Sequence, residues 1–349
     1  MKQRYSELDA IRGIAALMVV LYHYSARYGQ IYDYSIEPAF NFELGKFGVQ
    51  LFFIVSGFVI FLTLDRTVHA MDFIISRLSR LYPAYWFSVI LTFTVVYFFT
   101  LPGREVGIKS AIVNLSMFQS WVGVPNVDGV YWTLAVELSF YLIMFVLFIT
   151  KIIKKITLIS IIWLCIIIFS EYLEVHENIN IHRLIKLMLL LDYGNLFIAG
   201  IMFYKIMQEN KISSYLVLVM SLVTELYLHG IVVLAVAIFF FIFILFVKGY
   251  LKLLSMKPLV FLGTISYSLY LIHQNIGYIV IQRLEENDLA TPFSIIILPL
   301  LISISIASVM QIYIERPSLL VIRSKWKESN LRKHLTSDRD PKSPVKQIL

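Results

Sequence analysis

The sequence is poor in charged residues and has a single cysteine. Only 15% of its 349 residues are Asp, Glu, Lys or Arg, whereas about a quarter are charged in a typical soluble domain. Apolar residues make up 59%, and the mean hydropathy is +0.78. This composition excludes a disordered chain and an ordinary soluble enzyme. Because Cys165 stands alone, an internal disulfide is excluded as well. An integral membrane protein is the class that remains.

Long runs with few or no charges set the expected membrane spans. A helix needs about 20 residues to cross the hydrocarbon core. The 36-residue run 212–247 is too long for one span, and Glu225, His229 and Gly230 near its middle predict two helices there. The sequence therefore predicts an all-α protein with about ten transmembrane helices. They are expected at 13–26, 47–64, 81–103, 129–150, 156–170, 187–204, 212–247 (two helices), 258–282 and 289–314.

The basic residues in the connections predict the orientation. With the N-terminus inside, 23 of the 30 Lys and Arg residues fall on the cytoplasmic side and seven on the other, in agreement with the positive-inside rule. Both termini are then cytoplasmic, and the net charge of +7 does not call for a nucleic-acid partner. Residues 1–320 are expected to form one polytopic domain. The polar residues that follow Pro317, 321–349 in particular, are expected to form a basic, disordered cytoplasmic tail.

Ionisable residues inside a span are costly, so they are candidate site residues. Arg12 and His23 are eleven residues apart, which places them within about 20° on one helix face and roughly 16 Å apart along it. Glu137 and His273 are expected at a depth similar to that of His23, in the outer half of the membrane. A carboxylate beside an imidazole fixes its tautomer, as a general base requires.

Each histidine also has a structural interpretation. His23 is also compatible with a buried ring bonded to a backbone carbonyl, although the cost of burial favours a functional role. His273 is compatible with a polar seam that only holds helices together, formed with neighbours that include Ser268 and Tyr270. Ser56 and Gly57 interrupt an otherwise bulky span, and for Gly57 we expect a close helix contact.

Two arginines three residues apart, Arg77 and Arg80, share a helix face at the expected inner rim. Taken alone they are typical of positive-inside anchoring. Together with Arg12 and Lys257 they predict a phosphate-binding cluster, because guanidinium groups bind phosphate oxygens in pairs. A metal site is not expected, since the chain has one cysteine and no pair of histidines at helical spacing within a span.

Six segments resemble, in the same order, motifs of the membrane acyltransferase 3 family. The first is an Arg-x10-His pattern formed by Arg12 and His23, and the others include an Arg-x-x-Arg pattern and a Trp-Ser-Leu-x-x-Glu pattern in which Thr133 replaces the serine. The segments are 8–23, 47–58, 77–83, 131–137, 263–273 and 315–317. The resemblance implies a ten-span enzyme in which Arg12 and His23 are the essential pair. It further implies that Arg77 and Arg80 act at a cytoplasmic donor site and that Glu137 is the family's acidic residue.

The resemblance also implies the reaction. The expected function is transfer of an acyl group, most commonly acetyl, from cytoplasmic acyl-CoA to a hydroxyl of a surface polysaccharide or its lipid-linked precursor in a bacterial cell membrane. Some relatives carry a fused SGNH hydrolase-like domain, and here such a step is expected to need a separate protein.

We expect His23 to be the general base, with Glu137 orienting its ring and acetyl-CoA as the donor; an acyl-histidine intermediate is a variant of this scheme. The rivals are a glycan transporter or flippase without acyl transfer and a scaffold for polysaccharide assembly.

Overall fold

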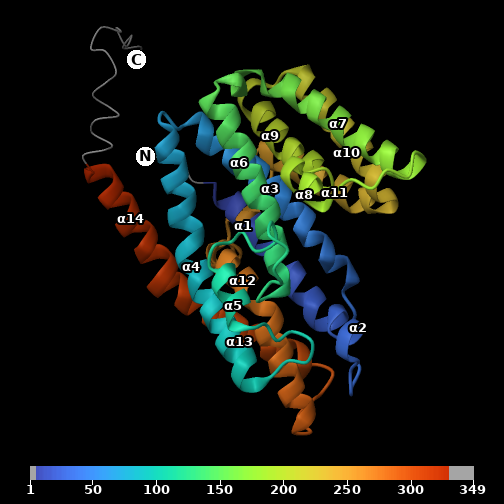
Figure 1. The fold of residues 1–349 in the computed structure, drawn as a ribbon, viewed down its shortest axis with the longest axis vertical. Helices are drawn as coiled ribbons and strands as arrows, with labels where there is room; N and C mark the ends of the chain where they lie inside the picture. The colour runs from blue at the N-terminus through green and yellow to red at the C-terminus, as the bar shows by residue number, and fades with distance from the viewer. Residues whose placement is uncertain (1–4, 330–349) are drawn as a thin grey trace.

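The computed structural model describes residues 5–329, and every regular element in this range is a helix (Figure 1). The prediction of an all-α protein is therefore confirmed. Ten helices have at least 15 residues. They are α1 (Ser6–Tyr22), α3 (Gly48–Asp65), α4 (Ala70–Phe99), α6 (Trp132–Ile149), α7 (Ile156–His176), α9 (Gly194–Glu209), α10 (Ile212–His229), α11 (Val233–Val247), α12 (Lys257–Glu286) and α13 (Ser294–Met310).

Shorter helices lie between them and, after α13, at the end of the described residues. Four are α-helices: α2 (Gly29–Tyr32), α5 (Ile108–Asn114), α8 (Arg183–Leu189) and α14 (Arg316–Glu328). Two are π-helical turns, η1 (His23–Arg27) and η7 (Gln311–Glu315). The remaining turns are 3₁₀: η2 (Glu43–Phe47), η3 (Gly129–Tyr131), η4 (Ile152–Lys155), η5 (Gly230–Val232) and η6 (Lys252–Ser255).

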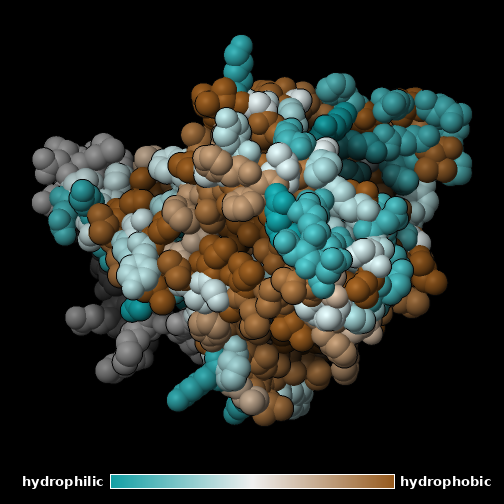
Figure 2. All heavy atoms as spheres, turned by 90° about the horizontal axis from the view of Figure 1, so that it is seen from below, coloured by the Kyte–Doolittle hydropathy of each residue, from teal (hydrophilic) through white to brown (hydrophobic). Residues whose placement is uncertain are grey.

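The surface of the bundle suits lipid. Large apolar side chains are exposed on several helices, among them Ile90, Phe98, Leu216 and Phe241. Figure 2 shows hydrophobic atoms over much of the face seen from below, with hydrophilic side chains gathered in patches. Seven segments of the described residues are long and apolar enough to cross a membrane. The chain is thus a multi-pass membrane protein, while the count of ten spans and the cytoplasmic termini stay predictions.

The long apolar run is split where the sequence predicted. Gly230 has a φ of 57°, a left-handed conformation that glycine adopts without strain, and it separates α10 from α11. Glu225 has a second role that the sequence did not reveal. Its fully buried carboxylate accepts a hydrogen bond from Asn195 Nδ2 at 2.6 Å, which ties α10 to α9.

Glycines set the distance between the central helices. A Cβ at Gly57 would lie 2.1 Å from the carbonyl oxygen of Phe197, and one at Gly200 would lie 2.0 Å from that of Ile54. Helices α3 and α9 can therefore approach this closely only because neither position has a side chain. The expected helix contact at Gly57 is confirmed. A similar contact joins α1 to α12, because a Cβ at Gly263 would lie 2.0 Å from the carbonyl oxygen of Asp9.

The chain after Pro317 differs from the expected disordered tail. It is helical as far as Glu328, and this helix, α14, lies alongside α4 (Figure 1). Trp326 Nε1 donates a hydrogen bond to Asp72 Oδ1 at 2.7 Å, and Leu319, Ile322 and Trp326 recur at helical spacing on a partly buried face. The prediction of disorder is wrong for this stretch, because it was based on the high content of charged residues and not on this apolar periodicity. The rest of the predicted tail, 330–349, lies outside the described residues.

Candidate active site

A cavity that we call the arginine cavity lies among helices α1, α3, α4, α6 and α12. Its lining includes the three arginines singled out from the sequence, so Arg12, Arg77 and Arg80 do come together. Serine, glutamate and tyrosine side chains complete the polar part of the lining: Ser56, Thr133, Glu137, Tyr141, Ser266, Tyr267 and Tyr270.

The arginine cavity contains three guanidinium groups and one carboxylate, that of Glu137. Among residues 5–329, the ion pairs do not involve Arg12, Arg77 or Arg80. Arg77 is 9% exposed, and its Nε has no hydrogen-bond partner in this range. Its guanidinium carbon lies 5.9 Å from the ring centroids of Phe73 and Tyr141. A buried cation without a partner is costly, so the cavity is suited to a multiply charged anion such as phosphate.

Glu137 belongs to the arginine cavity and not to the histidines. Its Oε1 accepts hydrogen bonds from Ser56 Oγ, at 2.8 Å, and from the Tyr141 hydroxyl. The expectation that Glu137 orients the ring of His23 is therefore wrong. Counting residues along the helix predicted the depth of Glu137. The direction of its side chain is set by its hydrogen-bond partners, which are Tyr141, one turn along α6, and Ser56 on α3.

Lys257 does not join the arginines. It is the exposed first residue of α12 and is not part of the cavity lining. Arg323 of α14 approaches from the other direction and donates to Ser76 Oγ at 3.2 Å. Arg77 donates to the same oxygen at 3.0 Å. Sequence reasoning missed Arg323. The helical spacing of the apolar residues Leu319, Ile322 and Trp326 around it is a signal that predicts a helix there.

His23 and His273 form a buried pair. His273 Nε2 lies 3.2 Å from His23 Nδ1, and the ring centroids are 4.9 Å apart. His273 thus takes the position beside His23 that we had assigned to Glu137. A purely structural role suits Ser268 better than His273. Ser268 Oγ donates a hydrogen bond to Glu315 Oε2 at 3.0 Å, and Ser268 does not line the arginine cavity.

Hydrogen bonds to the backbone determine which nitrogen of each ring carries the proton. His273 Nδ1 lies 2.8 Å from the carbonyl oxygen of Tyr270, so it is the donor, and its Nε2 carries a lone pair. His23 Nδ1 faces that lone pair and also the carbonyl oxygen of Val19 at 2.8 Å. Nδ1 of His23 must therefore carry the proton. Its Nε2, which has no hydrogen-bond partner among residues 5–329, is left as an acceptor.

A π-helical turn begins at His23. The backbone N–H of Tyr28 donates to the carbonyl oxygen of His23, five residues back, at 3.0 Å. Such turns insert one residue into a helix and are frequent at functional sites. Here the turn follows directly on α1, so Arg12 and His23 keep the register expected for one helix face, while the residues after His23 are rotated relative to it.

His23 lines a second cavity, the histidine cavity, of about 350 Å³. Three cations, Arg27, Lys46 and Arg104, share this lining with Trp132 and the amide of Gln274; the other lining residues are Val19, Tyr22, Val49, Gly129, Val130 and Tyr270. Two residues, Val49 and Tyr270, line both this cavity and the arginine cavity. The two cavities therefore adjoin at these two residues, which we call the Val49–Tyr270 partition.

Tyr270 and Asp128 hold the partition and the cavity rim in place. The Tyr270 hydroxyl lies 2.8 Å from Thr133 Oγ1, a bond between α12 and α6. Asp128 Oδ2 accepts a hydrogen bond from the backbone N–H of Asn275 at 3.2 Å and Oδ1 accepts one from that of Val130. Burial raises the pKa of Asp128 to about 6. Nothing in the sequence pattern distinguished Asp128 from a loop residue.

Known proteins that are similar to this chain include three acetyltransferases. O-acetyltransferase OatA of Staphylococcus aureus is 26% identical, over 89% of this chain and 56% of its own length. "Putative peptidoglycan O-acetyltransferase YrhL" of Bacillus subtilis is 30% identical over 39% of this chain and 22% of its own length. "Putative acetyltransferase ORF330" of Acidianus two-tailed virus is 28% identical over 41% of each chain. The chain thus spans about half the length of OatA.

No solved structure matches the chain. The family model does. It is the acyltransferase domain of the acyltransferase 3 family, and it matches residues 5–310, which include all the helices that form the two cavities. Arg12, His23, Arg77, Arg80 and Glu137 all lie within that match. The chain belongs to the acyltransferase 3 family.

Proposed function

We propose that the protein is a membrane O-acetyltransferase. It moves an acetyl group from acetyl-CoA to a hydroxyl of a cell-surface glycan or its lipid-linked precursor, in the cell membrane of a bacterium. The observation that carries the proposal is the pairing of two adjoining cavities that share Val49 and Tyr270 in their linings. One contains three arginines without an ion pair among residues 5–329, and the other contains an imidazole acceptor nitrogen. The names of OatA and YrhL support acetyl as the group and a glycan as the acceptor.

The lining of the arginine cavity, a space of about 90 Å³, suits phosphate groups of the donor. Arg12, Arg77 and Arg80 would hold its phosphates, because they offer forked N–H donors and the Nε of Arg77 has no other partner among the described residues. When bound, acetyl-CoA supplies a thioester carbonyl. Glu137, held by Ser56 and Tyr141, supplies the negative charge that keeps the arginines together when the donor is absent. The acyl end of the donor reaches the acceptor at the Val49–Tyr270 partition.

His23 acts on the acceptor. Its Nε2 takes the proton of the attacking hydroxyl, and the positive charge that develops on the ring is shared through the Nδ1 proton with Val19 and His273. The hydroxyl oxygen bonds to the acetyl carbonyl carbon, the C–S bond of the thioester breaks, and Nε2 returns the proton to the departing thiolate of CoA. The carbonyl of Tyr270 keeps His273 in the tautomer that accepts this proton. Both rings are therefore prepared for proton transfer before the acceptor binds, and no rearrangement is required during the reaction.

The test is acetyl transfer by the purified protein in lipid nanodiscs, with radiolabelled acetyl-CoA and isolated cell-wall glycan as acceptor. We expect His23→Ala to lower kcat by roughly 10²–10⁴-fold, the range of general-base catalysis. His69→Ala is the matched control, because His69 precedes α4 and lines neither cavity. Transfer that survives in His23→Ala at the wild-type rate would refute the assignment. Glycan movement without any acetyl transfer by the wild type would favour a transporter.

A further inference from the structure

A third cavity adjoins the histidine cavity, and the two meet at Trp132. This cavity, of about 410 Å³, is lined by Trp132 and by polar residues of the segment 180–193, among them Asn180, Lys186 and Tyr193. Trp132 is the residue that lines both cavities. Each volume lies within the range of about 300–1,000 Å³ typical of small-ligand sites. We call these two adjoining cavities, with Trp132 between them, the Trp132 groove.

We infer that the Trp132 groove binds an acceptor of at least two sugar units, with an anionic group on the unit that lies in the histidine cavity. The inference rests on the proposed function, since it names the acceptor of that same site. It goes further by assigning a second subsite, beyond Trp132, and by assigning charge to the unit that reacts.

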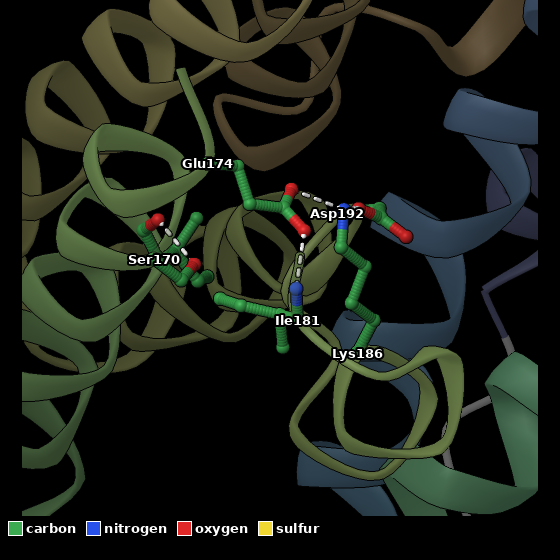
Figure 3. Close-up of polar contacts among 6 residues, drawn as sticks. Ser170, Glu174, Ile181, Lys186 and Asp192 are labelled. Carbon is green, nitrogen blue, oxygen red and sulfur yellow. Dashed lines mark hydrogen bonds and ion pairs between the residues drawn. The ribbon is translucent and has the colours of Figure 1, made fainter. Parts of the chain in front are cut away.

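The two cavities differ in free charge. Arg27, Lys46 and Arg104 lie around His23, and none of them takes part in an ion pair among residues 5–329. In the third cavity, Lys186 is already neutralised, which leaves Arg183 as the one lining cation without an ion pair among residues 5–329. Figure 3 shows the ammonium group of Lys186 between Glu174 and Asp192, with Asp192 Oδ1 at 3.8 Å. Three unpaired cations around His23 against one beyond Trp132 thus favour a negative charge on the sugar unit beside His23.

The wall of the third cavity is held in place by Glu174 of α7. Glu174 Oε1 accepts a hydrogen bond from the backbone N–H of Ile181 at 3.1 Å while its other oxygen binds Lys186 (Figure 3). One carboxylate at the end of α7 therefore fixes both the 177–182 connection and α8. Subsites built on such fixed segments bind a sugar without the cost of ordering a loop.

Gln274 offers a hydrogen-bonding atom to the acceptor. It is 4% exposed, and its Oε1 has no partner among the described residues. A Cβ at Gly129 would lie 2.4 Å from this oxygen and 3.0 Å from Arg104 Nη1. The missing side chain at Gly129 thus keeps the amide oxygen and the guanidinium at the cavity. A buried unpaired acceptor is costly, and a sugar hydroxyl satisfies it.

Trp132 is placed as a platform between the units. Its side chain is 36% exposed at the first turn of α6, and its ring packs 5.6 Å from that of Tyr193. A flat aromatic surface binds the apolar C–H face of a sugar ring at little entropic cost. Loss of this surface should therefore weaken a long acceptor more than a single unit.

The experiment is a binding titration with the purified full-length protein in nanodiscs, which needs no turnover. The probes are a hexuronate monomer, a hexuronate tetramer, the neutral hexose tetramer and a hexose phosphate. We expect the hexuronate tetramer to bind at least tenfold more tightly than either its monomer or the neutral tetramer. Comparable binding of the hexose phosphate and the hexuronate monomer indicates that any anion serves, and stronger binding of one identifies the anionic group. Absent or equal binding of the hexuronate and neutral tetramers overturns the inference.

Variants test the two parts separately. Trp132→Ala should weaken tetramer binding about tenfold and monomer binding by a smaller factor, and Trp132→Phe should restore most of the loss. Lys46→Gln should weaken only the anionic probes, while Lys109→Gln, a matched exposed cation on α5 outside both cavities, should have no effect. A uniform loss for all probes in Trp132→Phe overturns the second subsite. His23→Ala should still bind the tetramer, so a failure of the proposed chemistry is distinguishable from a failure of the groove.

Discussion

Replacement of His273 tests the hydrogen-bonded histidine pair directly. His273→Leu removes the lone pair that faces His23 Nδ1 at 3.2 Å and replaces the ring with an apolar side chain of similar size. His23 then retains only the carbonyl of Val19 as partner. The hydrogen bond between η1 and α12 is kept, because the Tyr24 hydroxyl donates to the backbone oxygen of His273, at 2.7 Å, and not to its ring.

The size of the effect follows from one buried hydrogen bond. Removal of one partner of such a bond costs about 1–3 kcal/mol, which corresponds to a roughly 5–150-fold lower kcat if the bond strengthens as charge develops on His23. The KM for both substrates should not change, since His273 lines neither cavity. His273→Gln restores an acceptor oxygen and should recover part of the rate. Activity is therefore expected to fall in the order wild type, His273→Gln, His273→Leu, His23→Ala.

The assay is single-turnover transfer of radiolabelled acetyl in nanodiscs, at saturating acetyl-CoA, with thermal unfolding of each variant as a check on folding. A kcat of His273→Leu equal to that of the wild type would refute a positioning role for His273. Equal loss in His273→Leu and His273→Gln, with unchanged unfolding temperatures, would refute the assigned tautomers.

Three further predictions concern the donor site, the packing and the pH dependence. Arg77→Gln should raise the KM for acetyl-CoA at least tenfold, while Lys257→Gln, a cation outside the cavity, should leave it unchanged. Gly200→Val should destabilise the protein by about 1–3 kcal/mol, seen as a lower unfolding temperature, because its Cβ would lie 2.0 Å from the carbonyl oxygen of Ile54. Asp128 has a folded pKa of about 6 against an ordinary value of 3.8, so the folded state binds the extra proton and stability should fall as pH rises through that interval. Asp128→Asn should lack this slope in thermal unfolding between pH 4 and 7.

Counting along helices predicted much of the site. The eleven-residue spacing placed Arg12 and His23 on one face, and they line adjoining cavities. The depth of His273, fifteen residues after Pro258, matched that of His23, and the two rings meet. Both successes depend only on helix rise and twist, which the sequence determines once a helix is recognised.

The failures concern contacts between helices. The rotation of Glu137 toward Ser56 and Tyr141 depends on how α3 and α6 pack, and no spacing within one helix contains that information. Arg323 was missed because its helix is stabilised by α4, through the bond from Trp326 to Asp72. Asp128 was missed because its burial depends on Asn275, which is 147 residues away in the chain.

The partition of Val49 and Tyr270 has a consequence for the cell. An enzyme that works across a membrane risks becoming a leak for protons and ions, which would drain the electrical potential the membrane maintains. Where the two cavities adjoin, the two shared lining residues carry an aliphatic side chain and an aromatic ring, groups that do not hydrate ions. On the proposed function, the thioester arm of the donor passes such groups more readily than a hydrated ion does. Substitution of Tyr270 by glycine should therefore be measured as conductance as well as catalysis.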